Sequence, residues 1–253
     1  MPFADAVLSD DSFLDGRLRV LQPRAGYRAA TDPVFLAAAV PARMGETALD
    51  LGCGAGVAGL CLAARVPGVR LAGVELQSDY AELARRNAAR NHVEIEVIEA
   101  DIAALPPELR ARNFDHVIMN PPWYRGDSPR AHDAGRDAAL REAAPLAVWT
   151  DAGLRRLRPG GRLTVIQLAE RLGEILAALD GRASAVVLPL AAREGAEAGR
   201  VIVQARKGAR APLRLLAPLV LHSGSAHAGD GEDFTPAANA VLRGGAPLVL
   251  GRR

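Results

Sequence analysis

ETALDLGCGAG (residues 46–56) decides the fold of this chain. Its first six residues, ETALDL, predict a strand, and the glycines permit a tight turn before the apolar helix pattern of VAGLCLAARV (57–66). A strand, a glycine-rich loop and a helix in this order begin a parallel βαβ unit, in which ligands bind beyond the carboxyl ends of the strands. The sequence therefore predicts a ligand site directly after Leu51.

The same alternation continues downstream. The patterns predict further strands at 69–76, 93–101, 114–119 and 161–168, separated by helices at 78–91, 137–157 and 169–180 and by a broken helix at 102–110. We expect Pro159-Gly160-Gly161 to stop the helix at 137–157. The last two strands, 183–190 and 200–207, are joined by too short a loop for a parallel crossover, so they form a hairpin. We expect an α/β fold with a Rossmann-like, doubly wound, mostly parallel sheet that ends in an antiparallel hairpin.

Segments on both sides of this core complete the expected organisation. A leader of residues 1–44 holds a short strand at 16–22 and a helix at 31–39, for which Asp32 is a candidate cap and Pro33 the first helical residue. From about residue 208 a C-terminal extension adds an extended stretch, a Gly/Asp loop and a helix capped by Thr235. We expect the leader to pack on one domain of residues 45–253.

Composition excludes several classes of protein. There is no run of 18 apolar residues, and the N-terminus is acidic rather than basic, so neither a membrane span nor a signal peptide is indicated. The two cysteines, Cys53 and Cys61, cannot form a zinc site alone, and no CxxC motif occurs, so we expect no metal and a reduced cytoplasmic setting.

The net charge of +2 conceals an asymmetry between the two halves of the chain. Residues 1–150 hold 16 basic and 20 acidic residues, whereas residues 151–253 hold 15 and 9. A run of five basic residues without an intervening acid crosses the second half: Arg200, Arg206, Lys207, Arg210 and Arg214. This half is a candidate contact for a phosphate backbone, with an ordinary solvated face as the alternative.

Two nucleotide sites compete for the glycine loop. Gly54, Gly56 and Gly59 satisfy the dinucleotide pattern G-x-G-x-x-G, with Glu75 about 20 residues on. The other interpretation is the acidic-x-G-x-G-x-G loop of an S-adenosylmethionine site, which begins at Asp50 and gives Gly52 a role. An acid before the first glycine suits a cationic ammonium and sulfonium better than a pyrophosphate, so the second interpretation is favoured.

Acidic residues mark three successive strand ends. Asp50 is followed by Glu75, which can accept two ribose hydroxyls, and by Asp101, which can accept from an adenine amino group with Ile102 against the ring. Asp101 taken alone fits a helix cap or a surface carboxylate equally well. The series as a whole is what indicates a nucleoside site.

NPPW (120–123) ends the next strand, 114–119. Asn120 offers a side-chain acceptor, the Pro-Pro step fixes an extended backbone with outward carbonyls, and Trp123 supplies a flat face. This combination predicts a clamp for a planar group that bears an NH2, with a proline-rich turn as the alternative. Its place after the three acidic strand ends favours the clamp.

The motifs ALDLGCGAG, GVEL, EAD and NPPW resemble, in this order, those of class I S-adenosylmethionine-dependent methyltransferases that methylate amino groups. The leader LQPRAGYRAATDPVFLAAAVPA (21–42) and the tail LVLH…FTPAANAVLRGG are similar to the bacterial tRNA-valine adenine N6-methyltransferase family. The resemblance implies a seven-stranded sheet. Such proteins more often carry Tyr or Phe at the position of Trp123, which keeps the identity of the base open.

The resemblance also implies a role for each site residue. Asp50, Gly52, Gly54 and Gly56 would line the methionine end of the cofactor, Glu75 with Leu76 the ribose, and Asp101 with Ile102 the adenine. Asn120, also counted as a cofactor contact, and the Pro121 carbonyl would each accept an amino hydrogen, with Pro122 stiffening the clamp and Trp123 stacking on the base. Thr31 would close over the cofactor or begin the helix, and Tyr27, Arg28 and Arg125 would contact the substrate.

The expected target is adenine N6 in a tRNA. A guanine amino group of ribosomal RNA and a protein glutamine are chemically equivalent alternatives, although the glutamine-modifying family usually carries a helical domain before its glycine motif. A non-catalytic RNA-binding module and a nicotinamide dehydrogenase remain as alternatives of other classes.

Overall fold

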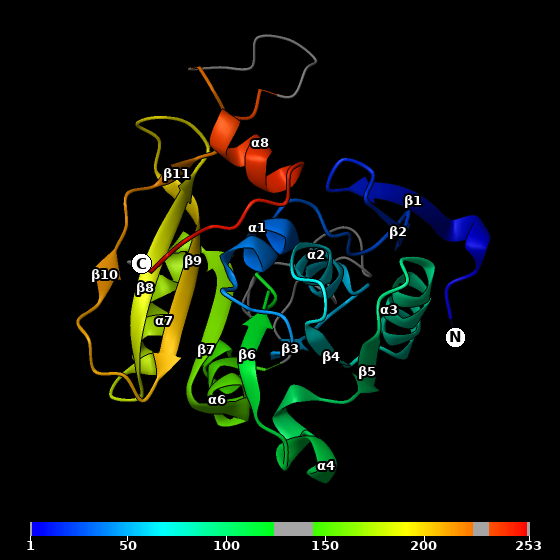
Figure 1. Cartoon of the computed structure of the whole chain (residues 1–253), viewed down its shortest axis with the longest axis horizontal. Coiled ribbons are helices and arrows are strands. Elements are labelled where there is room, and N and C mark those ends of the chain that lie inside the picture. The colour runs from blue at the N-terminus through cyan, green and yellow to red at the C-terminus, as the bar shows by residue number, and fades with distance from the viewer. Residues whose placement is uncertain (1, 124–143, 225–232, 252–253) are drawn as a thin grey trace.

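A computed structural model describes residues 2–123, 144–224 and 233–251 (Figure 1). Its centre is a mixed sheet in the order β10-β8-β9-β7-β6-β3-β4-β5, with β11 also paired to β8. The parallel strands are β3 (Thr47–Leu51), β4 (Arg70–Glu75), β5 (Ile95–Glu99), β6 (Phe114–Met119) and β7 (Leu157–Leu168). The expected α/β fold is confirmed.

The antiparallel hairpin is also present. β8 (Ala183–Ala191) and β9 (Ala198–Lys207) pair antiparallel, and β9 lies between β8 and β7 and is antiparallel to both. The expected count of seven strands is too low. Two-residue strands β10 (Arg214–Leu215) and β11 (Leu219–Val220) pair with the free edge of β8, because the extended tail satisfies backbone groups that an edge strand leaves open.

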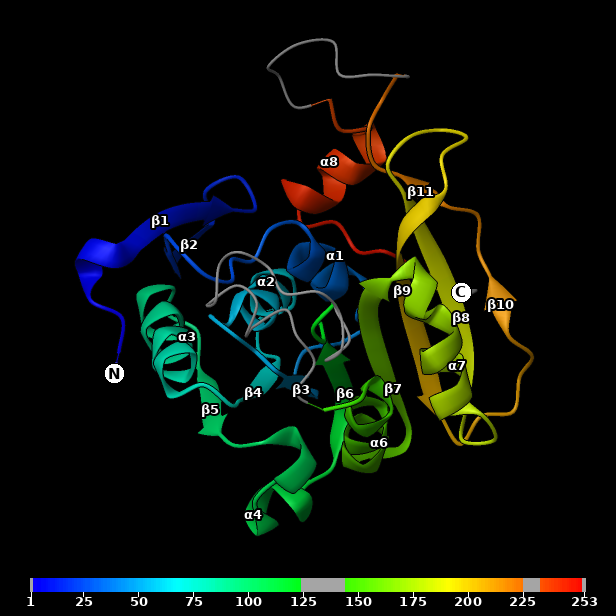
Figure 2. The same cartoon turned by 180° about the vertical axis from the view of Figure 1, so that it is seen from behind.

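Helices cover both faces of the sheet and divide the core in two. One cluster lies under α1 (Asp32–Ala39), α2 (Val57–Arg65), α3 (Ser78–Arg90) and α8 (Pro236–Leu242), which face the viewer in Figure 1. The other lies under α4 (Pro107–Arg110), α6 (Leu146–Arg156) and α7 (Leu172–Leu179), seen from behind in Figure 2. Neighbouring strand residues alternate between the clusters, as Val117 and Ile118 do, because a pleated strand points successive side chains to opposite faces.

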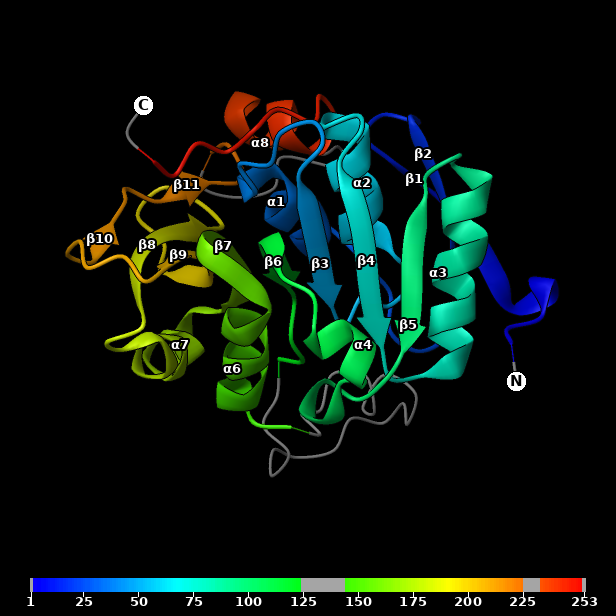
Figure 3. The same cartoon turned by 60° about the horizontal axis from the view of Figure 1, so that its bottom comes forward.

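The register of the parallel strands brings four strand ends to one edge. Leu51 pairs with both Met119 and Val74, and Glu75 pairs with Glu99. Figure 3 shows the arrowheads of β3, β4 and β5 pointing to the same side of the molecule. The residues that follow these strands are therefore neighbours in space, as the sequence predicted.

A two-stranded ribbon precedes the core. The strand expected at 16–22 is β2 (Leu18–Pro23), and it pairs with β1 (Leu8–Phe13), which was not predicted and follows the short 3-10 helix η1 (Asp5–Val7). The outer edge of β2 is bound by two asparagines, Asn87 of α3 and Asn91, the C-cap residue of that helix. The proposed division into a leader and a domain stays a prediction.

The expected cap of α1 is wrong. Thr31, not Asp32, is the N-cap residue, and neither side chain caps the helix. The Asp32 carboxylate instead accepts from Nε of Arg200 at 3.1 Å. Arg200 belongs to β9, so the fold gives Asp32 a cationic partner in place of the free helix amides. At the other end of the chain, the Thr235 side chain does cap α8, accepting from the Ala238 amide at 3.2 Å.

The role expected for Pro159-Gly160-Gly161 also changes. Residues 137–143 of the predicted helix lie outside the described residues, and α6 ends at Arg156. β7 begins at once with Leu157, and residues 158–161 form a bulge opposite Asp115, after which Arg162 pairs with His116. Gly160 has φ +75°, so the glycine permits the bulge without ending the strand.

The broken helix expected at 102–110 consists of η2 (Ile102–Ala104) and α4, and η3 (Ala169–Arg171) precedes α7. Across residues 2–123, 144–224 and 233–251, no helix combines the length and the apolar character that crossing a membrane requires.

Candidate active site

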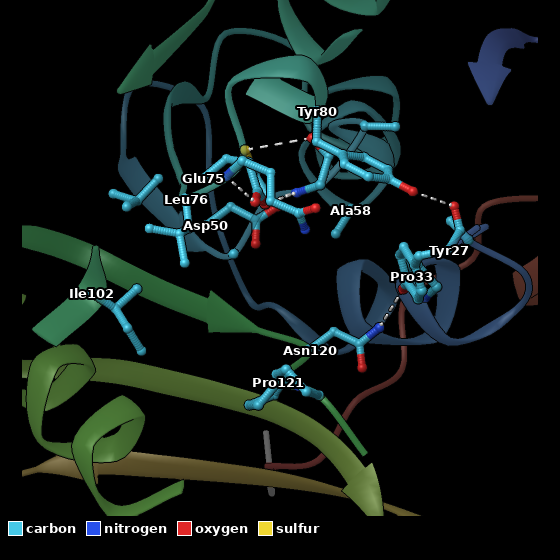
Figure 4. Close-up of a pocket in the computed structure, with 18 of the residues that line it drawn as sticks. Tyr27, Pro33, Asp50, Ala58, Glu75, Leu76, Tyr80, Ile102, Asn120 and Pro121 are labelled. Atoms are coloured by element: carbon cyan, nitrogen blue, oxygen red, sulfur yellow. Dashed lines mark hydrogen bonds between the residues drawn. The ribbon is translucent and has the colours of Figure 1, made fainter. Parts of the chain in front are cut away.

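A cavity opens at the carboxyl ends of β3, β4 and β6, where the expected site lies. Figure 4 shows Asp50 and Glu75 next to each other, with Asn120 and Pro121 across from them. Twelve of the residues expected at the site line this cavity: Tyr27, Asp50, Gly52, Gly54, Glu75, Leu76, Asp101, Ile102, Asn120, Pro121, Pro122 and Trp123.

Gly52 shows why the loop after β3 needs glycine. It has φ +70°, and a Cβ at this position would lie 2.6 Å from Cη2 of Trp149. The amides of Gly52 and Cys53 both donate to the Val74 carbonyl, at 2.8 and 2.9 Å. The loop therefore turns sharply against β4 while an indole ring covers its backbone.

Glu75 is tied into the same loop. Its Oε2 accepts from the Gly54 amide and its Oε1 from the Gln77 amide, both at 2.9 Å. Burial raises the pKa of Glu75, while these two hydrogen bonds oppose the shift by stabilising the carboxylate. The carboxylate is thus fixed at the end of β4, on the cavity wall.

Asp50 has less support, because a single backbone hydrogen bond, from Gly59, opposes the rise of its pKa. It is 5% exposed, and its Oδ2 is buried with no hydrogen-bond partner among the described residues. Burial raises the pKa of Asp50 to about 8, and the adjacent Glu75 carboxylate adds to the shift. A buried carboxyl pair of this kind stabilises a bound cation, since a positive charge compensates both the burial and the repulsion.

Asp101 performs the capping role that the sequence left open. Its Oδ1 accepts from the Ala103 amide at 2.8 Å and begins η2. Asp101 and Ile102 nevertheless both line the cavity, so a cap and a ligand contact are compatible here.

Asn120 is held by a tyrosine. Its Nδ2 donates to Oη of Tyr27 at 3.3 Å, and Figure 4 shows the amide nitrogen turned toward Tyr27 and the oxygen turned away. The Tyr80 hydroxyl donates to the Tyr27 carbonyl at 3.0 Å. Burial raises the pKa of Tyr27, with Asp32 and Asp50 adding to the shift, so the phenol stays neutral. Asn120 Oδ1 is buried and has no donor among the residues that the structure describes.

The remaining clamp residues are supported from β7, η3 and β9. The carbonyls of Pro121 and Pro122 accept from Gln167, and Pro122 also accepts from Arg171. The Arg200 guanidinium lies over the ring of Trp123, 4.2 Å from its centroid.

Three of the expected site residues that the structure describes do not line the cavity. Thr31 and Gly56 are the N-cap residues of α1 and α2 and lie outside the lining. Arg28 is exposed and pairs with Asp11 at 2.6 Å. Arg125 lies outside the described residues. Their proposed roles stay predictions.

Sequence reasoning missed several residues at the site. Tyr80 and Trp149 line the cavity, and Nε1 of Trp149 is buried without a partner among the described residues. Both aromatics lie in helices, where spacing does not distinguish a cavity wall from an ordinary core position. Gln167 carried the one usable signal, because an amide ending an otherwise apolar strand needs a polar partner.

The described residues include no group of three or more His, Cys, Asp or Glu side chains placed to hold a metal ion. The expectation of a metal-free site stays a prediction.

A family model for the methyltransferase small domain matches residues 31–179. The chain belongs to this family. It is therefore an S-adenosylmethionine-dependent methyltransferase, as the order of motifs from Asp50 to Trp123 indicated.

Curated relatives carry a more specific name. A protein of Aeromonas hydrophila is 30% identical over 79% of this chain and 85% of its own length, and one of Porphyromonas gingivalis is 32% identical over 65% and 68%. One of Shewanella halifaxensis is 29% identical over 62% of this chain, which spans 64% of that relative, just under two thirds of its length. All three are named tRNA1(Val) (adenine(37)-N6)-methyltransferase.

Solved structures share the fold. A protein of Agrobacterium tumefaciens described as a predicted O-methyltransferase has a TM-score of 0.70 and 30% identity, covering 86% of this chain and 98% of its own. A methyltransferase subunit of a type I restriction-modification system from Streptococcus thermophilus has a TM-score of 0.61 at 21% identity, covering 86% and 53%, and supports the fold alone.

Proposed function

We propose that this chain transfers a methyl group from S-adenosylmethionine to the exocyclic amino group of an adenine in a tRNA. The observation that carries the proposal is the buried Asn120 Oδ1, which has no donor among the described residues. A buried acceptor without a donor costs free energy, and an amino hydrogen of a substrate removes that cost.

The residues of the cavity fit the cofactor. S-adenosylmethionine supplies, when bound, a methyl group activated by a sulfonium, and it also carries an ammonium and a ribose. Asp50, with its partnerless oxygen, would hold the cationic end beside the glycine loop, and Glu75 would accept the ribose hydroxyls. Asp101 and Ile102 would contact the adenine. In this assignment the buried Asp50 carboxylate would lie next to a positive charge, which compensates the free-energy cost of its burial.

The clamp acts on the geometry of the amine. The lone pair of an aromatic amine is delocalised into the ring, so the nitrogen is a weak nucleophile. Asn120 Oδ1 and the free lone pair of the Pro121 carbonyl would accept one hydrogen each and favour a pyramidal nitrogen. Trp123 would hold the ring by stacking, and positioning then supplies most of the rate enhancement. No dedicated base is required, because a methylated aminium is strongly acidic.

Two acceptors favour an amine over a hydroxyl target. A hydroxyl carries one hydrogen and would leave one of the two carbonyl oxygens without a donor, which argues against oxygen methylation despite the description of the Agrobacterium protein. The names of the relatives support adenine N6 of a tRNA. To reach the clamp the base must be unstacked, which costs least in a loop.

The decisive experiment incubates the protein and labelled S-adenosylmethionine with unmodified tRNA, ribosomal RNA and total protein, followed by mass spectrometry of the digested nucleosides and peptides. We expect N6-methyladenosine confined to tRNA. Methylguanosine in ribosomal RNA, methylglutamine in protein or an O-methylated product would each replace the substrate proposed here. Absence of transfer to all three pools would contradict amino methylation of these substrates.

A further inference from the structure

Arg200 lies apart from the rest of the basic run to which it belongs. Its neighbours in β8 and β7 are Leu190 and Leu168, at the end of the sheet that carries the cavity. Arg206 pairs in register with Arg162, at the opposite end of the pairing between β7 and β9. Arg200 and Arg206 therefore lie near opposite ends of β9, and their surroundings differ.

Three segments distant in sequence meet at Arg200. Its guanidinium carbon lies 4.2 Å from the ring centroid of Trp123, after β6, and its Nε lies 3.1 Å from Oδ2 of Asp32, at the start of α1. The Arg200 and Asp32 side chains are 26% and 16% exposed. Burial raises the pKa of Asp32, and Arg200 opposes the shift, so the carboxylate depends on this partner.

The physics of this contact constrains Trp123. A guanidinium over an indole face is held by the quadrupole of the ring, and the attraction strengthens as water is excluded. A planar guanidinium can also stack on an aromatic face, which would restrict rotation of the ring. Arg200 thus covers part of the Trp123 ring and does not itself line the cavity, so among the described residues the side of Trp123 that lines the cavity is available to a ligand.

We propose that Arg200 is a positioning residue that holds one face of the Trp123 indole, so that the other face receives the target base. Asp32 fixes the guanidinium in turn. The inference rests on the proposed function for the identity of the ligand, but the contact between Arg200 and Trp123 exists in the free protein. It explains why a basic residue at this end of β9 is not simply a solvated charge.

A double-mutant cycle tests the inference. Arg200→Ala should lower kcat/KM for tRNA about tenfold, and in a Trp123→Ala background the same change should have less than a twofold effect. A direct contact of Arg200 with an RNA phosphate would give the same tenfold loss in both backgrounds and a weaker salt dependence of KM. That second pattern overturns the proposal.

A spectroscopic measurement makes the inference independent of catalysis. The chain has two tryptophans, so the difference between the emission of the wild type and that of Trp123→Phe isolates Trp123. Arg200→Ala should change this emission in the free protein and weaken its quenching by adenosine about tenfold. Arg206→Ala, on the same strand, should change neither. Unchanged Trp123 emission and quenching in Arg200→Ala overturns the inference even where methylation is lost.

Conservative variants separate charge from stacking. Arg200→Lys keeps the charge without a planar group, so we expect at most partial recovery of adenosine quenching, and full recovery contradicts the stacking role. Asp32→Asn should reproduce part of the Arg200→Ala effect, and cofactor affinity measured by calorimetry verifies that each variant is folded. If the wild type methylates no RNA but the emission coupling is present, the proposed function fails and the positioning role stands.

Discussion

The side-chain amide of Gln167 donates to the carbonyls of both Pro121 and Pro122, at 3.2 and 3.1 Å. Its own Oε1 accepts from the Leu168 amide at 2.7 Å, and the residue is fully buried. β7 thus holds the backbone that follows its neighbour β6. Because a carbonyl oxygen has two lone pairs, Pro121 keeps one for a substrate hydrogen.

Replacing Gln167 with Leu should lower kcat about 10- to 100-fold while the affinity for the cofactor changes little. The substitution leaves the Pro121 carbonyl without its donor, and a displacement of about 1 Å at a reacting group can cost on the order of 10² in rate. Steady-state kinetics on tRNA and calorimetry with the cofactor measure the two effects.

Gln204→Leu is the matched control for this variant. Gln204 is a buried glutamine in the neighbouring β9, and its Nε2 donates to the Ala39 carbonyl at 2.8 Å, away from the clamp. We expect a comparable loss of stability and unchanged kcat. Equal losses of kcat in both variants would mean that Gln167 acts through stability alone.

Asn120→Ala should reduce kcat by about 10²–10³, by analogy with removal of one preorganised polar partner. The cofactor dissociation constant should stay within a few-fold, because the clamp acts on the acceptor amine. Single-turnover kinetics separate the chemical step from RNA binding. Asn239→Ala, whose amide donates to the Phe234 carbonyl next to α8, is the control and should leave the rate unchanged. Near-normal turnover of Asn120→Ala would refute the clamp.

Much of this architecture was predictable because its signals are local. The Asp50–Gly56 loop, the acidic strand ends and the hairpin each follow from residues close in sequence, and the parallel register brings them together. The sequence does not indicate partners that depend on tertiary packing. Asp32 looked like a cap until the fold placed Arg200 beside it, 168 residues away.

β10 and β11 lie in the extended stretch expected after residue 208, but their pairing with the sheet was missed for a related reason. β10 and β11 are each two residues long and form because they pair with the edge of β8. Two residues are too few to give a strand periodicity, so the sequence of 211–222 does not predict the pairing. Pro159-Gly160-Gly161 was misinterpreted because a turn signal does not distinguish the end of a helix from a bulge within a strand. Trp149, which lines the cavity, could not be predicted as a site residue because its position fits an ordinary apolar helix pattern.

Cofactor binding should release close to one proton near pH 7. The pKa of Asp50 is about 8 in the folded protein, against an ordinary 3.8, so below pH 8 the free site is mostly protonated. A cationic ligand requires the carboxylate, so affinity should rise by up to tenfold per pH unit between pH 6 and 8 and level off above. Calorimetry in two buffers of different ionisation enthalpy measures the protons released.

The same shift has a consequence for the cofactor-free protein. Between pH 4 and 8 the folded form keeps a proton on Asp50 that the unfolded chain has released, so this group makes the free energy of unfolding fall as pH rises. Asp50→Asn should abolish both the proton release and this contribution, whereas Asp101→Asn should keep them. Affinity that is independent of pH in the wild type would contradict the role of Asp50.

Asn87→Ala should destabilise the fold by about 2–4 kcal/mol, because three backbone groups lose a buried partner. The Asn87 side chain accepts from the Leu21 amide at 2.8 Å and donates to the carbonyls of Leu21 and Ala55 at 3.0 and 2.9 Å. Since Ala55 belongs to the glycine loop, the variant should also weaken cofactor affinity several-fold. Urea denaturation and calorimetry measure the two effects.

Asn91→Ala provides the control, because Asn91, the C-cap residue of α3, lies one turn beyond Asn87 and binds β2 in the same way. It accepts from the Arg19 amide at 2.9 Å and donates to the Arg19 carbonyl at 2.8 Å, but it is partly exposed and does not contact the glycine loop. Water replaces much of what it loses, so we expect about 1 kcal/mol of destabilisation and unchanged cofactor affinity. If both variants weaken cofactor binding equally, the contacts with β2 affect the site through overall stability, and the hydrogen bond from Asn87 to Ala55 has no separate role.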